Sequence, residues 1–163
     1  MGVERFQNYA YDVFGVKLTM DEAKEYKEIY YSAHPAIAKY HKTMARNIKK
    51  SEFVVETALG RRVKPNMYAD ALNIPVQGTI GETTKLSQIY LFEDYPKLMK
   101  EVMFVNTVHD SNVIDCPDEY IEDVSEALDT TMKQAWVEIS KSPLFHYHQL
   151  PMGVDVEYGK GWK

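Results

Sequence analysis

Hydrophobic and polar positions in the first fifty residues predict three helices. Apolar residues recur at helical spacing over residues 3–16, and Gly15 is suited to end that helix. Thr19 and Glu22 form a capping-box pattern that opens a second helix, in which apolar residues again recur at steps of three and four. Pro35 begins a third helix in the position that proline tolerates best.

The middle of the chain combines a short strand with a long helix. Residues 53–57 alternate as a strand should, and Gly60 favours a turn after them. Between about residues 66 and 100, the apolar positions follow a helical period. Pro75 and Gly78 interrupt this helix and are expected to kink it or to set its start.

Residues 101–115 read as two β-rich runs that meet at His109 and Asp110. A hairpin here would place the Asp110 carboxylate at the tip of an apolar ribbon, with the imidazole beside it. A charge on such a support needs a partner, and a metal ion is the usual one. Aspartate is also common in tight turns, so this stretch alone leaves a structural and a functional interpretation open.

The last part of the chain predicts one more helix and a final strand. Pro117 opens a helix whose continuous apolar stripe, ending at Ile139, is typical of a protein core. Val154–Tyr158 alternates as a strand. The predicted fold class is therefore α+β.

Composition limits the choices only broadly. The chain has 163 residues, which suffices for one domain or for part of a larger one. The lone Cys116 excludes an intramolecular disulfide and a cysteine-based zinc cluster. No apolar run approaches a membrane span, and the N-terminus has no signal core, so we expect an intracellular, cytoplasmic protein.

The distribution of charge is more informative than the net charge of −5. Basic residues dominate between Lys39 and Lys64, and acidic residues dominate between Glu93 and Glu138. This asymmetry suggests a side that faces phosphates, although solvated helix faces are at least as common. Asn73 and Gln77 would project from one helix face, either toward a nucleic acid or into solvent.

Four segments in this order carry a family resemblance: Thr57-Ala-Leu-Gly-Arg-Arg62, Leu72-Asn-Ile-Pro-Val-Gln-Gly-Thr79, Thr107-Val-His-Asp110 and the segment that begins at Val154. Together they resemble the C-terminal part of a family A, polymerase I-type DNA polymerase, over nearly the whole chain. The short link between Arg62 and Asn73 resembles bacteriophage members more than bacterial ones.

The resemblance implies a role in catalysis for two residues. Asp110 would be a ligand of the two magnesium ions, contributed by the palm hairpin, and His109 would lie against the primer terminus. Ser111 stands where many members of the family carry a glutamate. The implied cofactor is Mg²⁺, of which this chain holds one recognisable ligand.

The resemblance also implies contacts with primer–template DNA. Asn73 and Gln77 match positions that contact the minor groove, where every base pair offers acceptors. Arg61 and Arg62 would lie near the duplex backbone. Residues 1–65 would be the C-terminal part of the fingers with a connecting hairpin, and residues 66–163 half of the palm, with a long helix, the catalytic hairpin, a helix and the last strand.

Two expected parts of such an enzyme have no match in the sequence. Neither the motif A aspartate, which shares the metal ions, nor the motif B helix, which binds the incoming dNTP, is found. Asp115 or Glu157 is a weak candidate to replace the missing acid. We therefore expect a fragment of a DNA-directed DNA polymerase that is inactive alone and needs an N-terminal polymerase portion, on a separate chain or missing from this sequence.

Two other functions compete with this one. The chain could be a non-catalytic remnant that holds duplex DNA through its basic segment. It could also be a metal-dependent phosphohydrolase built on His109 and Asp110. The remaining histidines have no ligand-like spacing to this pair, which argues against the phosphohydrolase.

Overall fold

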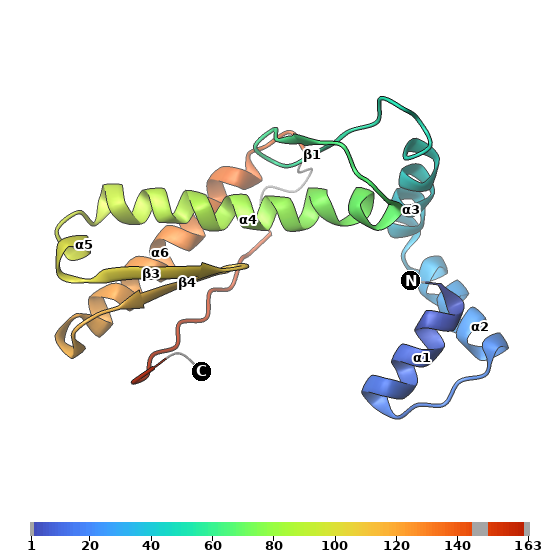
Figure 1. The fold of residues 1–163 in the computed structure, drawn as a ribbon, viewed down its shortest axis with the longest axis horizontal. Helices are drawn as coiled ribbons and strands as arrows, with labels where there is room; N and C mark the ends of the chain where they lie inside the picture. The colour runs from blue at the N-terminus through green and yellow to red at the C-terminus, as the bar shows by residue number, and fades with distance from the viewer. Residues whose placement is uncertain (1, 145–149, 162–163) are drawn as a thin grey trace. The chain divides into compact units, whose positions relative to one another are not determined.

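The computed structural model describes residues 2–144 and 150–161 (Figure 1). The chain divides into two compact units, Met1–Ser51 and Glu52–Lys163. Helices and two small antiparallel hairpins make up the described part of the chain, which confirms the α+β class.

The first unit is helical, as the sequence predicts. Its helices are α1 (Val3–Phe14), α2 (Met20–Ala33) and α3 (Pro35–Asn47). Gly15 ends α1 with a left-handed φ of 67°, which glycine adopts without steric cost. Thr19 and Glu22 form the predicted capping box at the start of α2.

The apolar faces of the first unit are mostly uncovered. Among its described hydrophobic residues, only Ala10 and Ala23 are buried. Tyr26, Ile29 and Tyr30 lie on the predicted apolar face of α2, yet each is about half exposed. The helical period is therefore correct, but it does not mark a core within this unit.

The second unit is built around two long helices. Its elements are β1 (Val55–Glu56), β2 (Arg62–Val63), α4 (Tyr68–Asp94), α5 (Leu98–Glu101), β3 (Met103–Val108), β4 (Ser111–Asp115), the 3₁₀ helix η1 (Asp118–Tyr120) and α6 (Ile121–Ser140). The contact between α4 and α6 is the most extensive in the chain. The β3–β4 hairpin runs back along α4 (Figure 1).

Small residues are prominent among the buried positions of α4 and α6. Helix α4 buries Thr79, Thr83 and Ser87, and α6 buries Ala127 and Thr131. Each of the four buried hydroxyls donates to a carbonyl one turn earlier in its own helix, which satisfies it without a partner across the interface. Short side chains let the two helices approach closely.

The long helix continues past Pro75 and Gly78, and it ends earlier than the sequence predicts. Helix α4 continues through Pro75, because its contacts with α6 and with the β1 region outweigh the local cost of a proline. It ends at Asp94, six residues early, and the short α5 follows after Pro96. A proline disfavours the helical conformation of the residue before it, here Tyr95.

One predicted strand is shorter than expected, and another is absent. In residues 53–57, only Val55 and Glu56 form a strand, which pairs with β2. The predicted strand at 154–158 is wrong, because residues 150–161 contain no strand. Val154 and Val156 are still better covered than Asp155 and Glu157, but alternation becomes a strand only where a neighbouring strand supplies backbone hydrogen bonds.

Candidate functional site

The predicted hairpin exists, and His109 and Asp110 form its two-residue turn. Val108 pairs with Ser111, so the turn is as short as a hairpin allows. His109 has a φ of 55°, the only positive φ of a non-glycine residue among those described. Both side chains of the turn are exposed. The structure thus places the Asp110 carboxylate at the tip of a hairpin.

A β-bulge at Val105 decides which side chains of the hairpin face α4. Phe104 pairs with Ile114 and Thr107 pairs with Asn112, although Phe104 and Thr107 are three residues apart. The extra residue in β3 therefore brings Phe104 and Thr107 to the same face. The ring of Phe104 lies 6.1 Å from that of Phe92 on α4.

A single amide bridges both strands of the hairpin near its tip. The Gln88 Nε2 atom on α4 donates to Thr107 Oγ1 at 2.8 Å and to Asn112 Oδ1 at 2.9 Å. Asn112 Nδ2 donates in turn to Ser87 Oγ at 3.2 Å. These bonds fix the hairpin on α4 three residues before Asp110 on one strand and two residues after it on the other.

One carboxylate does not make a two-metal site. Among the described residues, no group of three or more metal-binding side chains lies together. Asp115 pairs with Met103 at the base of the hairpin, five residues from Asp110, so the two acids are roughly 16 Å apart at strand spacing. Asp115 is therefore excluded as the replacement for a missing acid, and the residues present do not fit a pair of Mg²⁺ ions on their own.

The two predicted amides lie where the sequence placed them. Asn73 and Gln77 are exposed and one turn apart on the N-terminal half of α4. Gln77 and Gln88 are separated by eleven residues, or roughly 16 Å along the helix axis. The hairpin turn extends from the Gln88 level back toward Gln77 by about 7 Å, judged from strand spacing. The amides of Asn73 and Gln77 and the hairpin tip thus lie at successive positions along α4.

The turn that joins β1 to β2 is held against α4 by Glu82. The Glu82 carboxylate accepts hydrogen bonds from Thr57 Oγ1 and from the Leu59 N–H, the latter at 3.1 Å. Arg61 Nε lies 3.6 Å from Glu82 Oε1. A second anchor is the Ala58 N–H, which donates to Thr79 Oγ1 at 3.1 Å. The turn is thereby bound at two successive levels of α4.

Gly78 allows this close approach. A Cβ at this position would lie 2.6 Å from Thr57 Cγ2 and 2.9 Å from Arg61 Nη2. The Arg61 guanidinium therefore lies directly beside the helical turn that carries Gln77. Arg62 is exposed in β2, opposite Glu56. The structure places Arg61 beside Gly78, in the same helical turn as Gln77, whereas His109 and Asp110 lie further along the helix.

Sequence reasoning missed Glu82 and misread Gly78 as a helix breaker. A signal existed, because Glu82 is the only charged residue between Asp70 and Lys85, in a run of apolar and small side chains. Acids in such a run are seldom buried unless they are paired.

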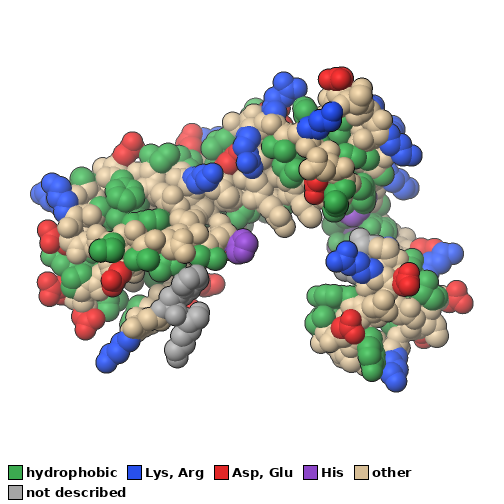
Figure 2. Space-filling view, in the orientation of Figure 1, with side chains coloured by type: hydrophobic (Ala, Val, Ile, Leu, Met, Phe, Trp, Pro, Cys, Tyr) green, Lys and Arg blue, Asp and Glu red, His purple; other side chains and the backbone are tan. Residues whose placement is uncertain are grey.

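Basic and acidic side chains gather over different parts of the second unit. Arg61, Arg62 and Lys64 are exposed near the N-terminal half of α4, and blue side chains cover that part of the face in Figure 2. Red side chains gather toward the end that carries α5 (Figure 2). The charge asymmetry of the sequence thus survives in space within this unit.

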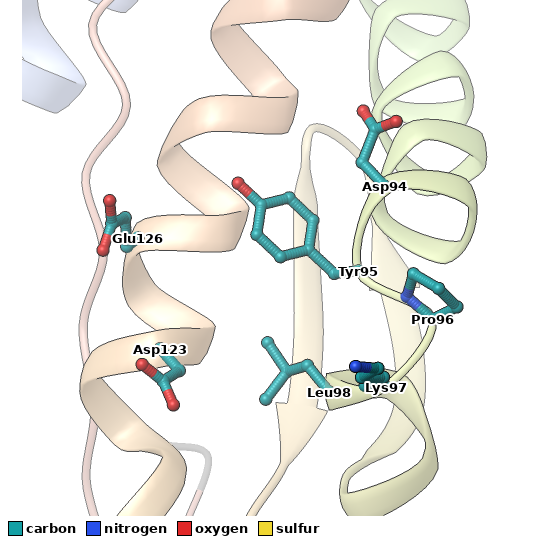
Figure 3. Close-up of a pocket in the computed structure, with 7 residues that line it drawn as sticks. All are labelled: Asp94, Tyr95, Pro96, Lys97, Leu98, Asp123 and Glu126. Carbon is teal, nitrogen blue, oxygen red and sulfur yellow. The ribbon is translucent and has the colours of Figure 1, made fainter.

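One cavity of the second unit lies away from the predicted residues. It has a volume of about 500 Å³ and is bounded by α6 and by the segment that links α4 to α5 (Figure 3). Tyr95 and Leu98 point toward α6 from that segment, and Asp123 and Glu126 lie on α6 (Figure 3). Phosphates would be repelled by these acids, so the cavity is not part of the candidate site.

Cys116 follows β4 and has no sign of a reactive thiol. Partial burial raises the pKa of the thiol, and the carboxylates of Asp115 and Asp118 raise it further. A raised pKa lowers the fraction of the nucleophilic thiolate.

Within the described residues, no helix has the length and apolar character that a membrane crossing requires.

Comparisons with known proteins show sequence similarity to DNA polymerases. Similarity extends to DNA polymerase I of Aquifex aeolicus, with 31% identity over 94% of this chain and 26% of that protein. DNA polymerase I of Lactococcus lactis subsp. cremoris is 27% identical over 89% of the chain and 17% of its own length. DNA polymerase theta of Caenorhabditis elegans is 22% identical over 90% of the chain and 9% of its own length.

The chain thus spans about a quarter or less of the length of these relatives. The sequence model of one family matches residues 14–163, which is most of the chain. The chain belongs to DNA polymerase family A.

Proposed function

We propose that this chain supplies part of the palm and fingers of a DNA-directed DNA polymerase, which transfers nucleotides from dNTPs to a primer 3′-hydroxyl during DNA replication. One observation carries the proposal: a single helix, α4, presents an amide pair at one level and supports an exposed aspartate on a hairpin at the next. Family membership supports the same reaction.

Each candidate residue has a role in this proposal. Asn73 and Gln77 donate to minor-groove acceptors, which occur on every base pair and so allow contact without reading the sequence. Arg61 and Arg62 bind backbone phosphates. His109 lies against the primer terminus.

Asp110 is the metal ligand in this proposal. It holds part of the Mg²⁺ site, and Mg²⁺ would lower the pKa of the primer hydroxyl and stabilise the leaving pyrophosphate. Because no group of three or more possible metal ligands lies together among the described residues, we expect a second polymerase portion to supply the other acid and the helix that binds dNTP. We assign residues 1–65 to the fingers and residues 66–163 to the palm, and the short link from Arg62 to Asn73 supports a bacteriophage-type enzyme.

Primer extension tests the proposal in two formats. The purified chain alone is expected to extend no primer. A chimera, in which residues 14–163 replace the matching segment of the Aquifex aeolicus polymerase, is expected to extend primers, and Asp110→Ala should reduce that rate by at least about 10²–10³-fold, as for the loss of one electrostatic group at a reacting centre.

Asp115→Ala is the matched control, because Asp115 is an exposed acid on the same hairpin. It should leave extension by the chimera within about twofold, the spread expected of a site with no shared partners. An active chimera that tolerates Asp110→Ala would refute the catalytic role and favour the non-catalytic DNA-binding remnant. Extension by the chain alone would refute the need for a second portion.

A further inference from the structure

Three groups from one turn converge on the Glu82 carboxylate, two by hydrogen bonds and one as an ion pair at 3.6 Å. They are the Thr57 hydroxyl, the Leu59 N–H and the Arg61 Nε atom. The Glu82 side chain is 12% exposed, whereas that of Arg61 is 58% exposed. The mostly buried Glu82 carboxylate therefore contacts Arg61, whose side chain is largely exposed to solvent.

This arrangement fixes the direction of the Arg61 side chain. Glu82 engages Nε, and Nη2 lies beside Gly78, 2.9 Å from where a Cβ would stand. Thr57, which is fully buried, closes the other side of the turn by accepting from the Arg61 N–H at 3.1 Å. These contacts place the guanidinium beside Gly78, in the helical turn that also carries Gln77.

We propose that Glu82 is a positioning residue for duplex DNA: it holds the β1–β2 turn so that Arg61 meets a backbone phosphate while Gln77 faces the adjoining minor groove. This inference rests on the proposed function. An acid near a polyanion opposes binding by its charge alone, so a gain from Glu82 can arise only through the orientation of its partners.

The salt dependence of DNA binding tests the inference with the 163-residue chain and a fluorescent primer–template duplex. The logarithm of the association constant falls linearly with the logarithm of the salt concentration. Each lost phosphate contact reduces the steepness of this slope by about 1. We expect Arg61→Ala and Glu82→Gln each to produce this loss. The double variant should bind as Arg61→Ala does, within about twofold, because both changes remove one contact.

The matched control is Asp129→Asn on α6, which neutralises an acid that pairs with Lys133 at 2.7 Å. This change should leave the slope unaltered. Far-UV circular dichroism checks that each variant is folded. If Glu82→Gln is unfolded, Arg61→Lys replaces it: lysine keeps the charge but has no Nε to engage Glu82, so its slope should fall as well.

The outcomes separate this inference from the proposed function. If the wild-type chain binds the duplex but Glu82→Gln binds equally or more tightly, the positioning role is refuted and the DNA contact stands. Additive losses in the double variant, or an Arg61→Lys slope equal to that of the wild type, refute it too. If the wild-type chain binds no duplex at any salt concentration, the DNA contacts of the proposed function fail and the inference fails with them.

Discussion

At the scale of single residues, two glycines of α4 have opposite surroundings. Gly78 faces Thr57 and Arg61, and a methyl group there would collide with Thr57 Cγ2. Gly81 has no atom within 4 Å of its missing Cβ. Both lie inside the same helix and have no positive φ, so they differ only in the space around them.

Gly78→Ala should therefore destabilise the second unit by about 1–3 kcal/mol, the usual cost of overpacking. Thr57 is fully buried and cannot move aside. Gly81→Ala is the control and should stabilise the unit by about 0.5–1 kcal/mol, because alanine favours helices over glycine. Urea unfolding measures both. Equal effects of the two substitutions would contradict the close approach described for Gly78.

His109 is the other residue with an unusual backbone. Its φ of 55° lies in the left-handed region, where histidine is found more often than most side chains. Glycine would adopt this value without cost. A histidine kept in this position is consistent with a role for the imidazole beside Asp110.

At the scale of elements, the packing of the β3–β4 hairpin against α4 depends on Gln88. Gln88→Ala removes two hydrogen bonds, each worth about 0.5–1.5 kcal/mol in net stability. We expect backbone amides of β3 and β4 to exchange with solvent deuterium faster by about tenfold or more, since 1.4 kcal/mol corresponds to a factor of ten. Mass spectrometry of hydrogen exchange measures the change.

Gln134→Ala on α6 is the matched control, because Gln134 is exposed on a helix that does not depend on the hairpin. It should leave exchange in β3 and β4 unchanged. Protection of the hairpin that survives Gln88→Ala would show that Phe104 and its contact with Phe92 suffice to hold it.

Most elements could be predicted because local signals set them. The capping box at Thr19 and the left-handed Gly15 need no distant partner. Helix α4 was harder, since it buries threonines and serines that hydrophobic periodicity does not count as core. The expected strand at 154–158 failed because pairing depends on a neighbour that no single segment specifies.

The candidate site divides in the same way. The position of Asp110 followed from two β-rich runs and the turn between them, and the common face of Asn73 and Gln77 followed from helical spacing. The partners of Glu82 could not be predicted, because Thr57 and Leu59 lie more than twenty residues away in the sequence.

At the scale of the whole molecule, the boundary between the two units falls in exposed chain. Residues 48–52 form turns, and Lys49 and Lys50 are exposed between α3 and the second unit. We expect brief trypsin digestion to cut there early and to release a product that starts at Lys50 or Ser51, because exposed segments between compact units are preferred sites of cleavage. Intact-mass spectrometry identifies it.

The double substitution of Lys49 and Lys50 by glutamine should abolish this product and leave the rest of the digestion pattern unchanged. A first cut within α4 or α6 would contradict the division into units.

Apolar side chains remain exposed on both units. Met103 and Val105 are 65% and 55% exposed on β3. Phe14 in the first unit is 68% exposed. Exposed apolar surfaces of this kind are typical of interfaces with other proteins.

The uninterrupted course of α4 through Pro75 has a consequence for how this chain can vary in length. One residue inserted between Gln77 and Gln88 would turn the two ends of the helix by about 100° relative to each other and lengthen it by about 1.5 Å. The Asn73 and Gln77 amides and the hairpin would then face different directions. This stretch should therefore tolerate substitution far better than insertion or deletion, whereas the link between α4 and α5 is free to change its length.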